Sequence, residues 1–197
     1  MNNESIRIGV LGEANAGKSE LIYRICHPTD LVPSITGGQM EPAVDVVNYE
    51  RHGSGGNVWV EFLVIPSETR HAVSRQMLYS IGLNALILVC DCSAPRTFLR
   101  VAEWIEDVAG AVCLDKVPIA LVLGGPLFVD WKASSIHSNL IDPIVTKYGA
   151  QVIDLSGYTG SPMLEPRQRR QLSLFYEHAL QSKAQRESGS INPSLLT

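Results

Sequence analysis

The sequence has little charge and no excess of basic residues. Charged residues make up 18% of its 197 residues, where an average soluble domain has about 25%. It contains 16 Lys and Arg against 20 Asp and Glu, which gives a formal net charge of −4. Proteins that bind nucleic acid usually carry a basic surface, so we expect no nucleic-acid partner.

Long hydrophobic segments and lipid-attachment signals are also missing. No run reaches the roughly 18 apolar residues of a membrane span, and the first apolar run is too short for a secretory signal. Asn2 stands where myristoylation requires glycine, and the last cysteine, Cys113, lies far from Thr197 at the C-terminus. We therefore expect a cytoplasmic protein without a direct lipid anchor.

Cysteine is scarce and lacks the spacing of a metal site. The four cysteines are Cys26, Cys90, Cys92 and Cys113, with no C-x-x-C pair among them. This pattern indicates a reduced intracellular protein rather than a disulfide framework or a zinc site. With 45% hydrophobic residues, the chain can bury a core without such cross-links.

The sequence does contain a regular alternation of strand and helix patterns. Helical patterns include one that ends at His27-Pro28 and one that contains 172–179. Between them lie helical patterns at 69–80, 98–112 and 134–148, where Pro143 either begins a shorter helix or kinks a longer one. The strand-like segments are 6–11, 44–49, 58–65, 85–90, 119–123 and 152–155.

The order of these segments predicts an α/β fold with a mostly parallel sheet. Segments 85–90 and 119–123 are apolar throughout, which is typical of strands buried on both faces of a parallel sheet. Only the turn at 52–56 joins two strands directly, as a hairpin. We expect one domain over 1–186 and a flexible polar tail over 187–197.

One motif carries a specific chemistry. Residues 12–19 read Gly-Glu-Ala-Asn-Ala-Gly-Lys-Ser, which matches G-x-x-x-x-G-K-[ST] between a strand and a helix. Backbone N–H groups of such a loop can surround a phosphate at a helix N-terminus. Lys18 would reach the β- and γ-phosphates, and the Ser19 hydroxyl would bind Mg²⁺. The expected binding residues are Glu13, Ala14, Asn15, Ala16, Gly17, Lys18, Ser19 and Glu20.

With this motif and this order of elements, the chain resembles the Ras superfamily, and within it the Rab-like proteins, over most of 5–183. The resemblance implies a three-layer P-loop NTPase fold of the Ras-like G-domain type. Its sheet would have six strands, mostly parallel with one antiparallel edge strand, and five helices would cover it. The resemblance also implies GTP or GDP as the bound ligand, together with Mg²⁺.

The first switch of that family has a candidate in Thr36. It lies 17 residues beyond Ser19 and is followed by Gly37-Gly38. The resemblance gives such a threonine a role in binding Mg²⁺ and sensing the γ-phosphate. Thr36 could alternatively only form a turn, and Thr29 is a second candidate for the role.

The second switch departs from the family pattern. The family has Asp-x-x-Gly after the third strand, then a glutamine that orients water. Here 64–67 reads Val-Ile-Pro-Ser, and Glu68 follows. Pro66 has no N–H, and Ser67 resists the close backbone approach that glycine allows. We therefore expect slow or absent hydrolysis and no catalytic residue here.

The guanine-reading motif Asn-Lys-x-Asp is also absent, because 125–128 reads Gly-Pro-Leu-Phe. Asp130 could replace its carboxylate, or it could be a solvated loop residue. Ser156, Gly157 and Tyr158 fit the family's last motif, Ser-Ala-Lys, which contacts the base mainly through its backbone. These residues complete the expected nucleotide site.

These features favour an atypical Rab-like GTPase that acts as a protein-binding subunit. Segment 184–188 is similar to the Rab-like subunit of the intraflagellar transport machinery, which implies coiled-coil partners in a cilium or flagellum. Thr36-Gly37 and 44–46 resemble instead a Rab-like regulator that handles lipid-modified Ras proteins.

Three other functions remain open from the sequence. The chain could be a conventional switch GTPase with displaced residues, a scaffold that binds no nucleotide, or a P-loop nucleotide kinase. A kinase needs arginines over the transferred phosphate. The cluster of Arg167, Arg169 and Arg170 falls on the last helix, which the resemblance places away from the site.

Overall fold

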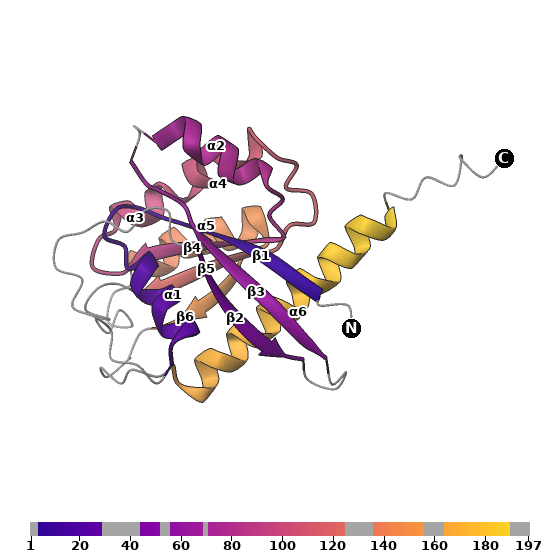
Figure 1. Ribbon diagram of the computed structural model, residues 1–197. Helices are drawn as coiled ribbons and strands as arrows, with labels where there is room; N and C mark the ends of the chain where they lie inside the picture. Colours follow the sequence, from indigo (N-terminus) through magenta and orange to yellow (C-terminus); the bar gives the residue numbers. More distant parts are fainter. Residues whose placement is uncertain are drawn as a thin grey trace.

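A six-stranded sheet forms the centre of the molecule, with the strand order β2-β3-β1-β4-β5-β6 (Figure 1). The computed structural model describes residues 4–28, 44–51, 56–68, 71–124, 136–155 and 164–189. β2 pairs antiparallel with β3 at one edge, and all other neighbouring strands are parallel. The strands are β1 (Glu4–Leu11), β2 (Val44–Glu50), β3 (Asn57–Val64), β4 (Ala85–Asp91), β5 (Ile119–Gly124) and β6 (Gln151–Asp154).

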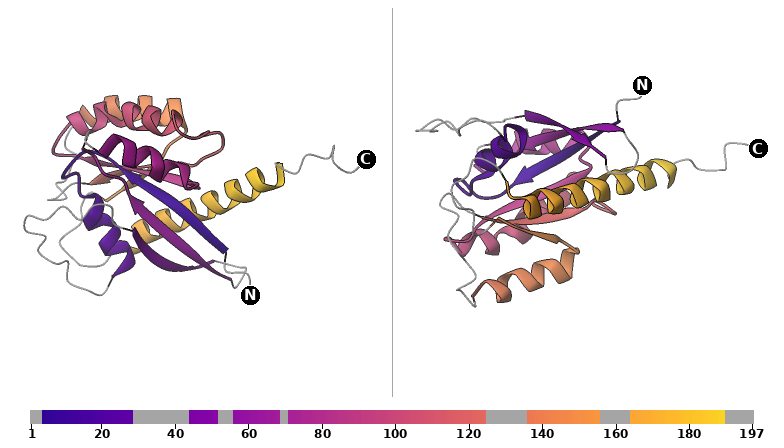
Figure 2. Two further views of the ribbon diagram at one scale, coloured as in Figure 1. Left: turned by 45° about the horizontal axis from the view of Figure 1, so that its top comes forward. Right: turned by 90° about the horizontal axis from the view of Figure 1, so that it is seen from below.

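Helices cover the two faces of the sheet and give the molecule three layers (Figure 2). α1 (Lys18–Cys26) and α6 (Pro166–Gly189) pack on one face, where Ile22 and Phe175 join a core with β-strand side chains such as Phe62. The second core lies on the opposite face. It is covered by α2 (Ala72–Ser80), α3 (Arg96–Leu99), α4 (Val101–Ala109) and α5 (Ile136–Tyr148).

The strand pattern follows from this layering. Every residue of β4 and β5 is buried, because both strands lie in the middle of the sheet with helices on either side. β2 lies at the edge, and its residues are mostly exposed or half-buried. The prediction of an α/β fold with a mostly parallel six-stranded sheet and one antiparallel pair is confirmed.

The helices differ from the sequence predictions in two places, and the structure also decides between the two alternatives for the helix that contains Pro143. The helix predicted at 98–112 is wrong as a single element, because α3 and α4 are separate helices with Arg100 between them. The Thr97 hydroxyl donates to the Asp91 and Ala94 carbonyl oxygens and ties the short α3 to the end of β4. α5 is the longer of the two alternatives, since it contains Pro143.

The last helix also extends further than expected, to Gly189, so that 187–189 are helical rather than part of a tail. The Arg186 guanidinium donates to the carbonyl oxygens of Leu83 and Asn84, at 3.4 and 3.3 Å. Lys183 and Glu187 form an i,i+4 ion pair at 3.9 Å. The Arg186 contacts hold the end of α6 against the turn before β4, and the ion pair lies within the helix. Residues 190–197 lie outside the described part of the chain.

No helix within the described ranges combines the length and the apolar composition that crossing a membrane requires.

Candidate functional site

The loop from β1 to α1 has a backbone shape that few sequences can adopt. Gly12 has φ 143°, and a Cβ atom there would lie 2.5 Å from the carbonyl oxygen of Val89 in β4. Asn15 and Gly17 also have positive φ, at 62° and 89°. Asparagine tolerates this region better than most residues, and glycine adopts it without strain. The motif residues therefore fold into a tight loop that closes directly against β4.

Lys18 is held inside this loop. Its ammonium donates to the carbonyl oxygens of Gly12 and Glu13, at 2.9 and 2.8 Å. Lys18 is also the first residue of α1, so its charge adds to the positive end of the helix dipole. Ser19 follows it in the first turn of α1 and is half-buried. The loop thus brings together a fixed cation, a helix N-terminus and a hydroxyl, which together suit a phosphate with its metal ion.

A second cation lies beside the loop and was not predicted from the sequence. The Arg100 guanidinium lies 3.2 Å from Oε1 of Glu13 and also pairs with Glu103 at 3.1 Å. Oε1 of Glu13 is buried but has no hydrogen bond to the described residues, so the contact with Arg100 is electrostatic rather than well aligned. Arg100 offsets the charge of an acid next to the proposed phosphate site. No local pattern could reveal it, because this pair joins distant parts of the sequence.

The connection after β3 is built from apolar side chains. Val64 is buried in the core and lies opposite Val10 of β1 in the sheet register. The Ile65 N–H donates to the Val10 carbonyl oxygen at 2.9 Å, and the Ile65 side chain is fully buried. Pro66 is buried as well. Where the family resemblance expects an aspartate, this chain has the buried Val64, and where it expects a flexible glycine, it has the half-buried Ser67.

The helix that follows, α2, is bound to α4 by a buried polar network. Arg75 is only 8% exposed, pairs with Asp107 at 3.1 Å and donates to the Glu68 carbonyl oxygen at 2.7 Å. The Tyr79 hydroxyl donates to the same Asp107 carboxylate at 2.8 Å. Burial, together with the Asp107 carboxylate, raises the pKa of Tyr79, so this hydroxyl stays protonated. Arg75 also stacks over the ring of Trp104, with 5.5 Å from its guanidinium carbon to the ring centroid.

The structure brings one group of the predicted site residues together, namely 13–20 in the loop and the start of α1. The other predicted residues lie outside the described ranges, and their roles stay predictions. They are Thr36 with its substitute Thr29, Asp130 with the segment 125–128, and Ser156, Gly157 and Tyr158. Arg167, Arg169 and Arg170 lie at the start of α6, and Arg169 lines a separate cavity.

Comparison with known proteins adds no assignment to this site. No family model matches the chain, and no curated protein matches it in sequence. What the site can do therefore follows from its residues: a tight loop with positive φ angles, an ammonium held by hydrogen bonds and an adjacent hydroxyl.

Proposed function

We propose that the chain is an atypical Rab-like module with a Ras-like P-loop NTPase fold, which holds GTP or GDP and Mg²⁺ in the 12–19 loop. The observation that carries this proposal is the position of Lys18. Its ammonium donates hydrogen bonds to the carbonyl oxygens of Gly12 and Glu13. The loop around it has positive φ angles at the glycines and the asparagine of the motif, which tolerate them. An ammonium held there would meet a phosphate without first having to be ordered.

The roles of the remaining loop residues follow from the same fit. The Ser19 hydroxyl, with Thr36, would bind Mg²⁺, and this ion would neutralise phosphate charge. Arg100 keeps the Glu13 carboxylate from opposing the phosphates. Asp130, Ser156, Gly157 and Tyr158 are proposed to contact the base.

Hydrolysis is proposed to be slow or absent. A switch must place a group near the γ-phosphate and move when the nucleotide changes. The described connection after β3 offers a buried valine and isoleucine instead, followed by Pro66. The helix behind it is held by the contacts of Arg75 and Tyr79 with Asp107. These features support a protein that retains its nucleotide as a structural ligand.

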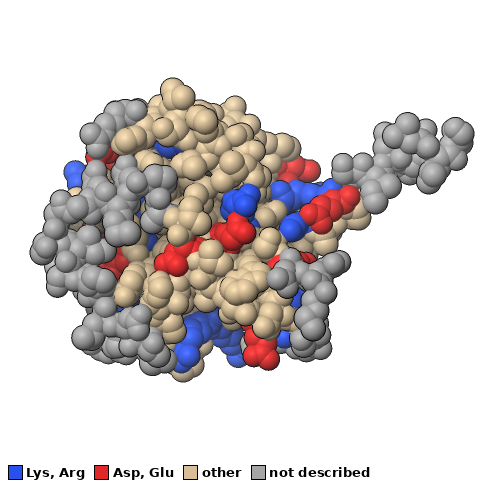
Figure 3. All heavy atoms as spheres, viewed as in Figure 1, with Lys and Arg blue, Asp and Glu red and all other residues tan. Residues whose placement is uncertain are grey.

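A surface on β2, β3 and α2 supports a role in binding a protein partner. Residues other than Lys, Arg, Asp and Glu cover much of the face that Figure 3 shows. Arg7 of β1 and Glu61 of β3, which lies opposite Val46 in the sheet register, form an ion pair. Large exposed apolar side chains are typical of an interaction site when several lie on neighbouring elements. The exposed apolar residues of these elements are Val44, Val46, Trp59, Val73, Met77 and, just beyond α2, Ile81.

The family resemblance makes the partner more specific. We propose coiled-coil subunits of the intraflagellar transport complex, with the protein acting in the cytoplasm and in a cilium or flagellum. Trp59→Ser should weaken the complex with the purified subunits by about tenfold. Leu174→Ser removes another exposed apolar side chain, from α6 on the other face of the sheet, and is the control. Equal binding of the subunits by both variants and the native chain would refute the proposal that this surface binds the partner.

Nucleotide binding is tested by titrating the purified protein with GTP, GDP and ATP, with and without Mg²⁺. We expect GTP and GDP to bind at least about tenfold more tightly than ATP, with Mg²⁺ strengthening GTP binding. Equal binding of ATP would show a generic phosphate loop. No binding of any nucleotide would leave a scaffold that keeps only the shape of the loop.

A further inference from the structure

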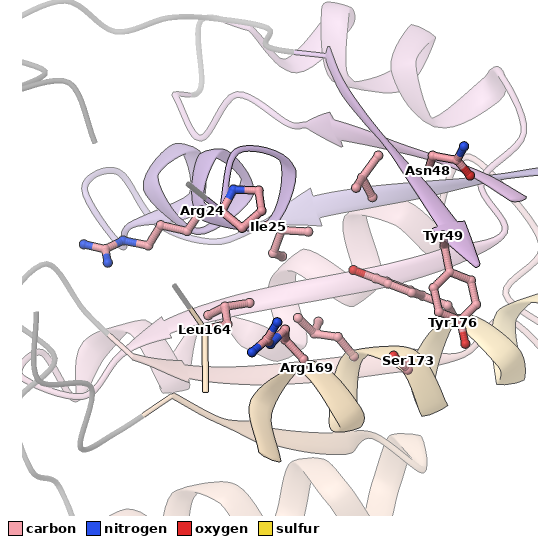
Figure 4. Close-up of a pocket in the computed structure, with 11 residues that line it drawn as sticks. Arg24, Ile25, Asn48, Tyr49, Leu164, Arg169, Ser173 and Tyr176 are labelled. Atoms are coloured by element: carbon pink, nitrogen blue, oxygen red, sulfur yellow. The ribbon is translucent and has the colours of Figure 1, made fainter. Parts of the chain in front are cut away.

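A cavity of about 210 Å³ lies between the end of α1, strand β2 and the first half of α6 (Figure 4). It is separate from the 12–19 loop and shares none of its residues. Its walls are largely apolar and include Ile25, Val47, Leu164 and Leu172. An apolar protein cavity of about 150 Å³ can hold a benzene molecule. This cavity therefore has room for one aromatic ring with small substituents.

One polar group in the wall, the Tyr176 hydroxyl, has no hydrogen-bond partner among the described residues. Tyr176 is 5% exposed, and its hydroxyl makes no hydrogen bond with the part of the chain that the structure describes. In Figure 4 this hydroxyl points from α6 toward α1. Burial raises the pKa of Tyr176, so the group stays a neutral donor. A buried hydroxyl without a partner is costly, and a bound acceptor would remove that cost.

The neighbouring tyrosine provides an internal comparison. Tyr49 lines the same cavity and packs edge-on against Tyr176, with 5.3 Å between the ring centroids. Its hydroxyl, however, donates to Glu177 at 3.1 Å. Two similar rings thus lie side by side, and only the Tyr176 hydroxyl lacks a described partner.

Two arginines line the cavity, and only Arg24 has an ion-pair partner among the described residues. Arg24 pairs with Glu20 at 2.6 Å, and its side chain extends away from the other labelled residues in Figure 4. Arg169 is exposed and forms no ion pair with a described residue. Arg169, Ser173 and Tyr176 follow one another at i, i+4 and i+7, so they share one face of α6. Seven helical residues span about 10 Å, roughly one aromatic ring with a polar atom bound at each end.

We propose that this cavity binds an aromatic carboxylate that carries an oxygen acceptor opposite its carboxylate. The ring fills the apolar space, Arg169 pairs with the carboxylate at the open side, and the Tyr176 hydroxyl donates to the distal oxygen. Both groups that lack a described partner are then satisfied by one small molecule. The site does not depend on the proposed nucleotide function.

The first test titrates the full-length protein with 4-hydroxybenzoate and follows chemical shifts or heat. We expect saturable binding that weakens by about tenfold for 4-methylbenzoate, which lacks the distal oxygen, and for 4-hydroxybenzyl alcohol, which lacks the carboxylate. Lys18→Ala should bind 4-hydroxybenzoate as the native chain does, which separates this site from the nucleotide site. Absence of saturable binding up to about 10 mM would overturn the proposal.

Variants assign the two polar contacts. Tyr176→Phe should weaken 4-hydroxybenzoate binding about tenfold and leave 4-methylbenzoate unchanged. It should also raise the melting temperature of the free protein, because it removes an unpaired buried hydroxyl. Tyr49→Phe, the matched control, should keep the affinity. Equal loss of affinity in both variants would contradict the assigned contact.

Arg169→Gln should weaken both carboxylates about tenfold but not the alcohol. Arg170→Gln, on the same helix but outside the cavity, should change neither. If the two arginine variants bind alike, the cation of this site is not Arg169.

Discussion

The loop after β1 and the connection after β3 leave neighbouring strands at the same edge of the sheet, yet they are built in opposite ways. The loop after β1 has three positive φ angles, and the ammonium of Lys18 donates to two of the loop's carbonyl oxygens. The connection after β3 buries Val64, Ile65 and Pro66 and leads into a helix held by a polar network. The comparison teaches that a loop suited to a phosphate can lie beside a connection that, among the described residues, has neither the aspartate nor the glycine of a second switch.

Removing the cation from the first region should have the largest effect. We expect Lys18→Ala to weaken nucleotide binding by more than about 100-fold, because the charge in the loop is lost. Lys147→Ala, which removes an exposed lysine from α5, is the matched control. Calorimetric titration measures both variants, and circular dichroism checks the fold. Nucleotide affinity that is unchanged in Lys18→Ala would place the binding site elsewhere.

Breaking the network of the second region should cost stability. Asp107→Ala leaves the buried Arg75 without its carboxylate and the Tyr79 hydroxyl without its acceptor. We expect a loss of about 3 kcal/mol in the free energy of unfolding by urea, and faster hydrogen exchange in α2. Glu106→Ala changes the adjacent, exposed acid of α4 and should stay within about 0.5 kcal/mol of the native chain. Similar values for the two variants would mean that the network does not hold α2.

Placing the family's aspartate in the second region should not create a switch. Val64→Asp is expected to leave GTP turnover within about twofold of the native rate, because Ser67 and Glu68 remain. It should also lower the melting temperature, since Val64 is buried in the core. Turnover is measured by phosphate release. A large gain in GTP turnover would mean that 64–68 does correspond to the second switch. It would also mean that Ser67 and Glu68 are compatible with hydrolysis, contrary to our expectation.

The smallest effect concerns the reactivity of the cysteines. Burial, assisted by Asp45 for Cys26 and by Asp91 for Cys92, raises the pKa of each thiol to about 12. A raised thiol pKa means that thiolate forms only as the pH approaches 12, so at pH 8 these groups stay protonated and unreactive. Iodoacetamide at pH 8 should therefore modify the exposed Cys113 first, as mapped by mass spectrometry. Equally fast modification of Cys92 would show that the end of β4 opens in solution.

Much of the fold could be predicted from the sequence, because its signals are local. The apolar runs at 85–90 and 119–123 and the glycine-bearing motif at 12–19 each specify their structure within a few residues. The break at Arg100 and the extent of α6 could not be predicted, since contacts from Thr97 to β4 and from Arg186 to the turn at 83–84 decide them.

The candidate site divides in the same manner. Lys18 and Ser19 follow from the motif. Two ion pairs could not be predicted, namely Glu13 with Arg100 and Arg75 with Asp107. Each joins segments that are distant in the sequence, so no local spacing indicates it. The lack of a described partner for the Tyr176 hydroxyl could not be predicted either, because the sequence shows Tyr176 only as a member of an apolar helix face.

The most direct test of the proposal that this protein holds a nucleotide without cleaving it is a single-turnover experiment. The protein is loaded with GTP and Mg²⁺, separated from free nucleotide, and its bound nucleotide is identified over several hours. We predict that the bound ligand remains GTP, with a hydrolysis rate below the about 3 × 10⁻⁴ s⁻¹ of an unassisted small GTPase. Conversion of bound GTP to GDP at or above that rate, or failure to retain GTP at all, would contradict this account.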